Sequence, residues 1–217
     1  MVRLGVLVSG SGTNLQSILD ACADGAIEAR VAVVISNVAS AYALDRAHSA
    51  GVPTRIVSHK DYPDRDAFDT ELVRVLKEHE VELVCLAGFM RILTQDFIRA
   101  YPGRIMNIHP ALLPSFPGLD VRQSAIDHGV RFSGCTVHFV DEGVDTGPII
   151  IQAVVPVYPD DTEERLKDRI LKREHQIYPK AIQLYAQGRL SISGRRVLIH
   201  DHHHDEAAYL INPSLNT

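Results

Sequence analysis

Three polar residues in the middle of the sequence have the types and spacing of a catalytic group. Asn107 and His109 stand two residues apart at the end of an apolar run, and Asp145 follows in a glycine-containing turn. Residues two apart on a strand point to the same side, so an amide and an imidazole there could jointly stabilise an oxyanion. A nearby carboxylate would orient the imidazole and keep it protonated. Taken alone, the pattern also fits ordinary residues, because the chain has 11 histidines.

A second candidate is the glycine-containing segment at residues 9–14, directly after the first apolar run. Its glycines allow a tight turn that exposes backbone N–H groups, and a helix that begins there favours a bound anion. The segment therefore predicts a phosphate site at Gly12, Thr13 and Asn14. It is neither a dinucleotide fingerprint, which needs glycine where Leu15 stands, nor a Walker loop. The alternative is a helix cap without a ligand.

The elements that must position these groups follow from the alternation of apolar runs with helical patterns. We expect strands in the first half of the chain at residues 4–8, 31–35, 55–57, 82–87 and 104–109. Buried strands that alternate with helices predict an α/β fold, with a Rossmann-like, open, mostly parallel sheet and helices on both faces. Such sheets bind ligands beyond the carboxyl ends of their strands, where both candidate groups lie.

The second half of the chain is less regular. Residues 110–132 contain three prolines and predict a long loop with a short helix near 122–128, a length typical of functional loops. The elements expected after it are strands at 135–140 and 149–157, a helix at about 163–187 that bends at Pro179, and a hairpin at 191–200.

Composition excludes several classes of protein. The 217 residues are 46% hydrophobic and 23% charged, which is typical of a globular protein rather than a disordered one. The net charge of −5 argues against a nucleic-acid partner, and no apolar run reaches the ~20 residues of a membrane span. Three cysteines without metal-ligand spacing and no expected signal peptide predict a cytoplasmic protein.

The residues around His109 resemble the signature of the formyltransferase family that uses 10-formyltetrahydrofolate. The family pattern is Asn-x-His-Pro-Ser-Leu-Leu-Pro with a downstream Asp-x-Gly-Pro-Ile. Here residues 107–114 are Asn-Ile-His-Pro-Ala-Leu-Leu-Pro and residues 145–149 are Asp-Thr-Gly-Pro-Ile. Ala111 replaces the usual serine, which removes a hydroxyl but no catalytic group. The resemblance covers about residues 2–190, with further matching motifs at 9–14, 86–93 and 174–179.

The resemblance implies a formyltransferase-type fold and an enzyme of purine synthesis. Such an enzyme transfers the formyl group of its co-substrate, 10-formyltetrahydrofolate, to the amino group of glycinamide ribonucleotide and needs no metal. In this family pattern Asn107 and protonated His109 stabilise the oxyanion, while Asp145 keeps His109 charged and helps to move protons. Because Asp145 is a neighbouring carboxylate, we expect it to raise the pKa of His109 above its ordinary ~6.5.

The resemblance also implies where the two substrates bind. The nucleotide phosphate would lie on Gly12, Thr13 and Asn14, and Glu174 would bind the ribose hydroxyls. The implied folate-binding residues are Arg65, Phe89, Met90, Arg91, Ile92, Leu93, Val140, Asp141 and Val144. For residues 89–93 the alternative is ordinary core packing. Residues 1–200 would form one domain, with a nucleotide-binding half at about 1–100 and a folate-binding, catalytic half at about 101–200, before a His-rich tail at 201–217.

Three alternative functions share part of this pattern. Methionyl-tRNA formyltransferases and formyltetrahydrofolate hydrolases have the same core, but with an added nucleic-acid-binding domain or an N-terminal regulatory domain. A non-catalytic nucleotide-binding module would explain the glycine loop but not the Asn107, His109 and Asp145 group. The His/Asp run at 200–205 could bind zinc or nickel, although a solvated tail is the favoured interpretation. We further expect a cis bond at Leu113–Pro114, and a monomer or a homodimer.

Overall fold

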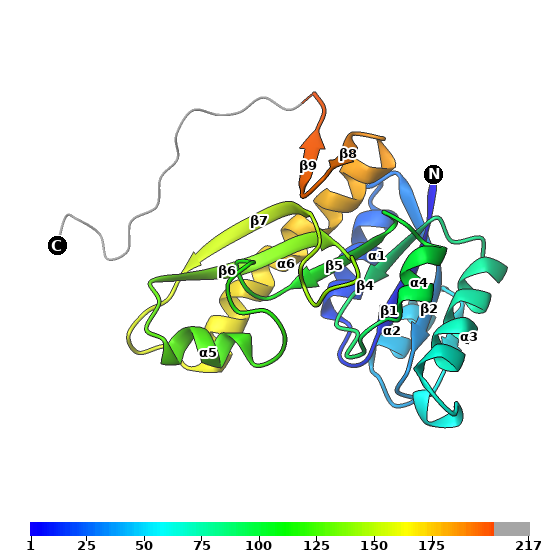
Figure 1. Ribbon diagram of the computed structural model, residues 1–217, viewed down its shortest axis with the longest axis horizontal. Coiled ribbons are helices and arrows are strands. Elements are labelled where there is room, and N and C mark those ends of the chain that lie inside the picture. The colour runs from blue at the N-terminus through cyan, green and yellow to red at the C-terminus, as the bar shows by residue number, and fades with distance from the viewer. Residues whose placement is uncertain (202–217) are drawn as a thin grey trace.

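The computed structural model describes residues 1–201 of the chain. Within them, one continuous sheet runs through the fold, with its strands in the order β3-β2-β1-β4-β5-β6-β7-β9-β8 (Figure 1). The strands are β1 Val2–Val8, β2 Ala29–Ser36, β3 Thr54–Ile56, β4 Leu83–Leu86, β5 Ile105–His109, β6 Phe132–Phe139, β7 Ile149–Pro156, β8 Leu190–Ser193 and β9 Arg196–Ile199. The strands β1 to β5 are parallel, and β6 then pairs antiparallel with both β5 and β7. The predicted α/β class is confirmed.

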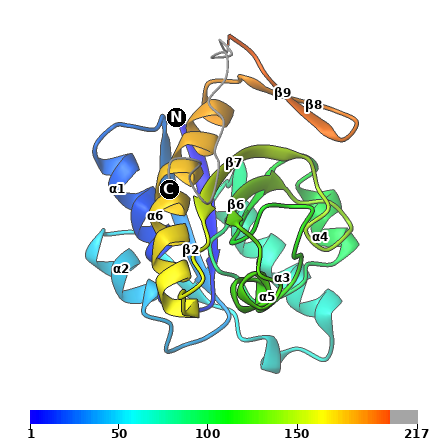
Figure 2. The ribbon, with the colours of Figure 1, turned by 90° about the vertical axis from the view of Figure 1, so that its left-hand side faces the viewer.

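Helices cover both faces of the sheet (Figure 2). They are α1 Thr13–Ala23, α2 Ala43–Ser49, α3 Arg65–Glu78, α4 Gln95–Ala100, α5 Val121–Asp127 and α6 Glu163–Ala186. The strand β4 shows how the sequence makes two layers: Leu83 and Cys85 join the core with α1 and α6, whereas Val84 and Leu86 join the core with α3 and α4. Alternate residues of a strand point to opposite faces, so four consecutive apolar residues give a strand that is buried on both sides.

Helix α6 is hydrogen-bonded to the central strands β4 and β5 near their carboxyl ends. It begins after Thr162, whose hydroxyl caps the first turn, and it continues through Pro179. The hydroxyl of the buried Tyr178 lies 3.0 Å from the carbonyl oxygens of both Leu86 and Met106. This contact joins α6 to the carboxyl ends of β4 and β5, where the candidate residues lie.

The C-terminal hairpin extends the main sheet, which the sequence did not predict. The strands β8 and β9 pair antiparallel as expected, but β9 also pairs parallel with β7 through Arg196 and Ile149. Helix α4 was also unexpected. Among the described residues, no helix has both the length and the hydropathy needed to cross a membrane.

Candidate active site

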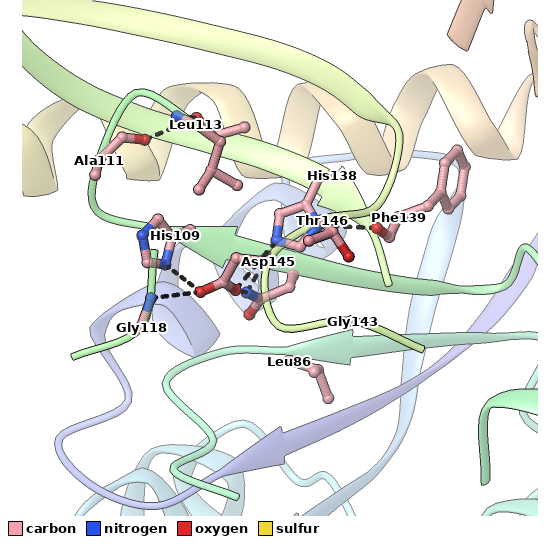
Figure 3. Close-up of polar contacts among 12 residues, drawn as sticks. Leu86, His109, Ala111, Leu113, Gly118, His138, Phe139, Gly143, Asp145 and Thr146 are labelled. Atoms are coloured by element: carbon pink, nitrogen blue, oxygen red, sulfur yellow. Dashed lines mark hydrogen bonds and ion pairs between the residues drawn. The ribbon is translucent and has the colours of Figure 1, made fainter. Parts of the chain in front are cut away.

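The candidate catalytic residues meet at the carboxyl end of β5 (Figure 3). This strand carries Asn107 and His109, and Asp145 reaches them from the turn between β6 and β7. One carboxylate oxygen of Asp145, Oδ2, lies 3.4 Å from Nδ1 of His109 and accepts a hydrogen bond from the N–H of Gly118 at 2.9 Å. Its Oδ1 accepts a longer bond from Nδ2 of Asn107 at 3.4 Å. The structure therefore brings the three predicted residues together around one carboxylate.

The turn that carries Asp145 leaves little freedom to this carboxylate. Asp145 itself has a positive φ of 54°, a conformation that most side chains avoid. A Cβ on Gly147 would lie 1.8 Å from the carbonyl oxygen of Phe139, so only glycine fits beside β6. Asp141 closes the turn, because its Oδ1 accepts hydrogen bonds from the hydroxyl of Thr146 at 2.6 Å and the N–H of Gly143 at 3.1 Å.

His109 is buried, and its environment changes the expected protonation. Its Nε2 lies 2.8 Å from the carbonyl oxygen of Phe116, so both ring nitrogens face groups that only accept hydrogen bonds. That geometry suits an imidazolium. Burial nevertheless lowers the pKa of His109 below its ordinary value, because it outweighs the opposing effects of Phe116 and Asp145. The expectation of a raised pKa was therefore wrong, since the sequence gives no measure of desolvation.

The pKa of Asp145 is also set by competing effects. Burial would raise it, but the neighbouring His138 ring, the Gly118 N–H and the charge of His109 together lower it. Asp145 is therefore a carboxylate throughout the neutral range.

His138 belongs to the same cluster and was missed in the sequence. It lies on β6 directly opposite Asn107 in the antiparallel register. Its Nδ1 faces the carbonyl oxygen of Phe139 at 2.8 Å, which leaves Nε2 to accept from Nδ2 of Asn107 at 3.2 Å. The same Nε2 lies 3.7 Å from Oδ1 of Asp145. The available signal was a single histidine inside the apolar strand 135–140, but its partner depends on strand register.

A buried hydroxyl holds the chain as it leaves β5. The Leu113–Pro114 peptide is cis, as predicted. The hydroxyl of Thr136 donates to the carbonyl of Ala111 at 2.7 Å and accepts from the N–H of Leu113 at 3.1 Å. Ala111 is fully buried, so its methyl group packs in the core at the position where the family pattern has serine.

A cavity of about 260 Å³ lies beside this cluster, between the glycine loop, the ends of β4 and β5, and α6. All four residues assigned to the nucleotide line it, namely Gly12, Thr13, Asn14 and Glu174. Gly12 has a φ of 71° and is the N-cap residue of α1, and a Cβ there would lie 2.6 Å from the Cβ of Ala43. The loop thus needs glycine at this point and presents a helix N-terminus to the cavity.

Glu174 of α6 lines this cavity and contacts the glycine loop. Its Oε2 accepts a hydrogen bond from Nδ2 of Asn14 at 2.7 Å, and the side chain is buried. Burial raises the pKa of Glu174, although Asn14 and the charge of Arg122 act in the opposite direction. Oδ1 of Asn14 is buried without a partner among the described residues, so this amide has an acceptor to offer a ligand.

The residues assigned to the folate divide into buried and exposed groups. Phe89 and Leu93 belong to the core with α3 and α4, and Val140 packs against it. The exposed apolar side chains of the set are Met90, Ile92 and Val144, at 65%, 60% and 49% exposure. Core packing therefore explains only part of segment 89–93, and its exposed side chains could contact a flat ring. Met90 also lines the cavity beside the glycine loop.

The remaining members of the folate set are polar. Arg91 has a buried Nε without a partner among the described residues. Arg65 begins α3, one turn before Asp69, whose carboxylate accepts from the N–H of Thr94 at 2.6 Å. No hydrogen bond or ion pair joins Arg65 to segment 89–93 in the described part of the chain, so its assignment stays a prediction.

Residues 1–201 contain no cluster of three or more His, Cys, Asp and Glu side chains arranged to hold a metal. Most of the His/Asp run at 200–205 lies outside the described residues, so its metal-binding capacity is not tested.

A mostly parallel sheet with a glycine loop after β1 and an Asn, His and Asp cluster at the carboxyl end of β5 fits a group-transfer enzyme. The chain belongs to the formyl transferase family, whose model matches residues 2–182. It is 42% identical to phosphoribosylglycinamide formyltransferase of Escherichia coli (strain K12), over 96% of this chain and 93% of that protein.

A solved structure of similar fold is glycinamide ribonucleotide transformylase 1 from Symbiobacterium toebii. It superposes with a TM-score of 0.91 at 58% identity, covering 92% of this chain and 94% of that one. The trifunctional purine biosynthetic protein adenosine-3 of Drosophila pseudoobscura pseudoobscura is 53% identical over 87% of this chain. The chain spans only 14–19% of the length of the trifunctional relatives.

Proposed function

We propose that the chain transfers the formyl group of 10-formyltetrahydrofolate to the amino group of glycinamide ribonucleotide, as a step of purine biosynthesis. The observation that carries this proposal is the polar cluster of Asn107, His109 and Asp145 directly beside a cavity formed by the glycine loop. The names of the relatives that match most of their own length support formyl transfer to this nucleotide.

The reaction needs positioning, charge stabilisation and movement of one proton. The amine nitrogen attacks the formyl carbon and forms a C–N bond, while the formyl C=O becomes an oxyanion. Collapse of this intermediate breaks the bond to the folate nitrogen, which takes up the proton that the amine loses. Asp145, directly or through water, is placed to accept and return that proton, because it stays ionised near neutral pH.

Asn107 and His109 stabilise the oxyanion in this proposal. The NH₂ group of Asn107 donates to His138 and to Asp145. The bond to Asp145 is the longer of the two, at 3.4 Å, so it is the one that Asn107 would give up to donate to the oxyanion instead. His109 is favoured as a neutral ring by burial, but a developing negative charge beside it would favour the cation. The imidazole thus takes up a proton from solvent as the oxyanion forms, and it returns that proton when the oxyanion becomes a carbonyl again.

The substrates occupy the two sides of this cluster. Gly12, Thr13 and Asn14 would hold the nucleotide phosphate, and Glu174 the ribose. The folate would lie along segment 89–93 and the turn at 140–144, with Arg65 toward its tail. In this proposal, the formyl transfer requires no metal ion.

We also propose a cytoplasmic monomer or homodimer acting on small molecules, without a nucleic-acid partner. All three cysteines are free, and two of them are buried, which supports a reducing compartment.

The test is an assay with both substrates, with either one omitted, and with product identification. Formylation of glycinamide ribonucleotide that depends on both supports the proposal. Release of formate without formylated nucleotide would instead indicate a hydrolase, and binding without any turnover would indicate a non-catalytic module.

A further inference from the structure

The nucleotide cavity has one charged residue that the family pattern did not supply. Among the described residues that line it, Arg122 of α5 is the only cation, and Glu174 is the only acid. The two side chains are close enough for the Arg122 charge to act on the Glu174 carboxyl group. The cavity wall therefore pairs one positive with one negative side chain.

Arg122 is held in place from the solvent side. Its Nε and Nη2 lie 3.3 and 3.1 Å from the same oxygen, Oε1 of Glu163 in the first turn of α6. Both contacts use one edge of the planar guanidinium, and Nη1 meets no acceptor in the part of the chain that the structure describes. The side chain is 27% exposed. It is therefore held in place at the cavity while Nη1 is available to donate hydrogen bonds to a ligand.

The remaining groups of the cavity cannot neutralise a phosphate by themselves. The start of α1 offers backbone N–H groups and a partial positive charge of roughly half a unit. A phosphate monoester carries up to two negative charges, and an ionised Glu174 would add a third. A guanidinium suits this task, because its planar fork matches phosphate oxygens and always keeps its charge.

We propose that Arg122 is a binding residue for the phosphate of the nucleotide substrate, opposite the glycine loop. This inference rests on the proposed function, because it assigns one group of the same substrate. It explains why a cation stands on the short helix α5 inside the long segment between β5 and β6: this segment brings a positive charge to the lining of the cavity.

The test compares two variants that break the same ion pair. Arg122→Gln removes the charge and the ion pair with Glu163, whereas Glu163→Gln removes only the ion pair. Steady-state kinetics with varied glycinamide ribonucleotide and saturating formyl donor should show a KM for the nucleotide raised about 10- to 100-fold in Arg122→Gln. Its kcat and its KM for the donor should change less than about threefold. Glu163→Gln should keep the nucleotide KM of the wild type, and thermal unfolding should show similar stability for both variants.

Equal effects of both variants on the nucleotide KM would overturn the assignment, because Arg122 would then only tie α5 to α6. An unchanged KM in Arg122→Gln, with an active wild type, would overturn the assignment and leave the proposed function intact. A wild type that does not formylate the nucleotide would refute the proposed function itself. Arg122→Lys, which keeps the charge and loses the fork, should show an intermediate KM.

Discussion

Replacing Asp145 by asparagine tests the centre of the proposed mechanism. The carboxylate accepts a hydrogen bond from Gly118, faces the His109 ring and accepts from Asn107. An amide has nearly the same shape, but it has one acceptor oxygen and no charge. Its NH₂ group must also point at one of these donors, so at least one contact becomes repulsive.

The expected loss follows from the two contacts that the amide weakens: the negative charge facing His109 at 3.4 Å and, where its NH₂ takes the place of Oδ1, the hydrogen bond from Asn107 at 3.4 Å. A hydrogen bond to a charged group contributes about 1.5–3 kcal/mol, and Asp145 is only 14% exposed, so solvent replaces little of this. Two such contacts give about 3–6 kcal/mol, which corresponds to a kcat lower by about 10²–10⁴-fold. The glycine loop follows another strand, so we expect the KM for the nucleotide to change less than threefold.

The assay measures formylated nucleotide at saturating concentrations of both substrates. Asp168→Asn is the matched control, because it makes the same carboxylate-to-amide change on an exposed residue of α6 that lies outside the candidate site. The control should keep the wild-type rate. If Asp145→Asn also keeps at least a tenth of that rate, the carboxylate only stabilises the turn and the mechanism is wrong.

The pH profile provides an independent check. Burial lowers the pKa of His109. As the pH rises, the ring of the free enzyme should therefore lose its proton at a pH below the ordinary ~6.5. Asp145 opposes this burial effect, and its removal should move the corresponding limb of the kcat/KM profile to lower pH. A limb above 6.5 in the wild type would contradict the burial argument.

Three further substitutions test the surroundings of the site. Gly12→Val should weaken nucleotide binding and lower the melting temperature, because its Cβ would meet that of Ala43 at 2.6 Å, whereas Gly10→Ala has open space and should keep the wild-type melting temperature. Glu174→Gln should raise the melting temperature more at pH 8 than at pH 5. Burial raises the pKa of Glu174, so the wild type loses stability as pH rises through that pKa; an equal shift at both pH values would refute this. Thr136→Val should lower the free energy of unfolding by about 1–3 kcal/mol in urea, because it leaves a buried N–H and a buried carbonyl unpaired, while Thr136→Ser should lose much less.

The strands could be predicted because their apolar runs report local burial. Residues 82–87 were expected as a strand, and β4 occupies Leu83–Leu86 within that range. The pairing of β9 with β7 was not predictable in this way, because it depends on where α6 returns the chain to the sheet edge. Local pattern thus gives the elements, while an added edge strand depends on tertiary geometry.

The residues of the candidate site show the same division. Asn107 and His109 could be found because they share one strand end, and Asp145 because it lies in a recognisable motif. His138 and Arg122 could not be found in this way, because the partners of each lie far away in the sequence. The contact of His138 with Asn107 depends on the register of β6 against β5, and the position of Arg122 depends on the packing of α5 against α6. The protonation of His109 was missed for a related reason, because desolvation depends on everything packed around the ring.

The register of β5 is what joins the two halves of the site. Asn107 and His109 point to one side of the strand and into the polar cluster, whereas Ile108 and Pro110 line the nucleotide cavity. In the proposed function, adjacent residues would therefore serve the chemistry and the nucleotide separately, and the amine would meet the formyl group where the strand ends. A shift of β5 by one residue in its register would exchange the side chains that face the polar cluster with those that line the cavity. The hydrogen bond from Tyr178 to the Met106 carbonyl fixes the strand one residue before Asn107, so the buried packing of α6 maintains the geometry of the candidate site.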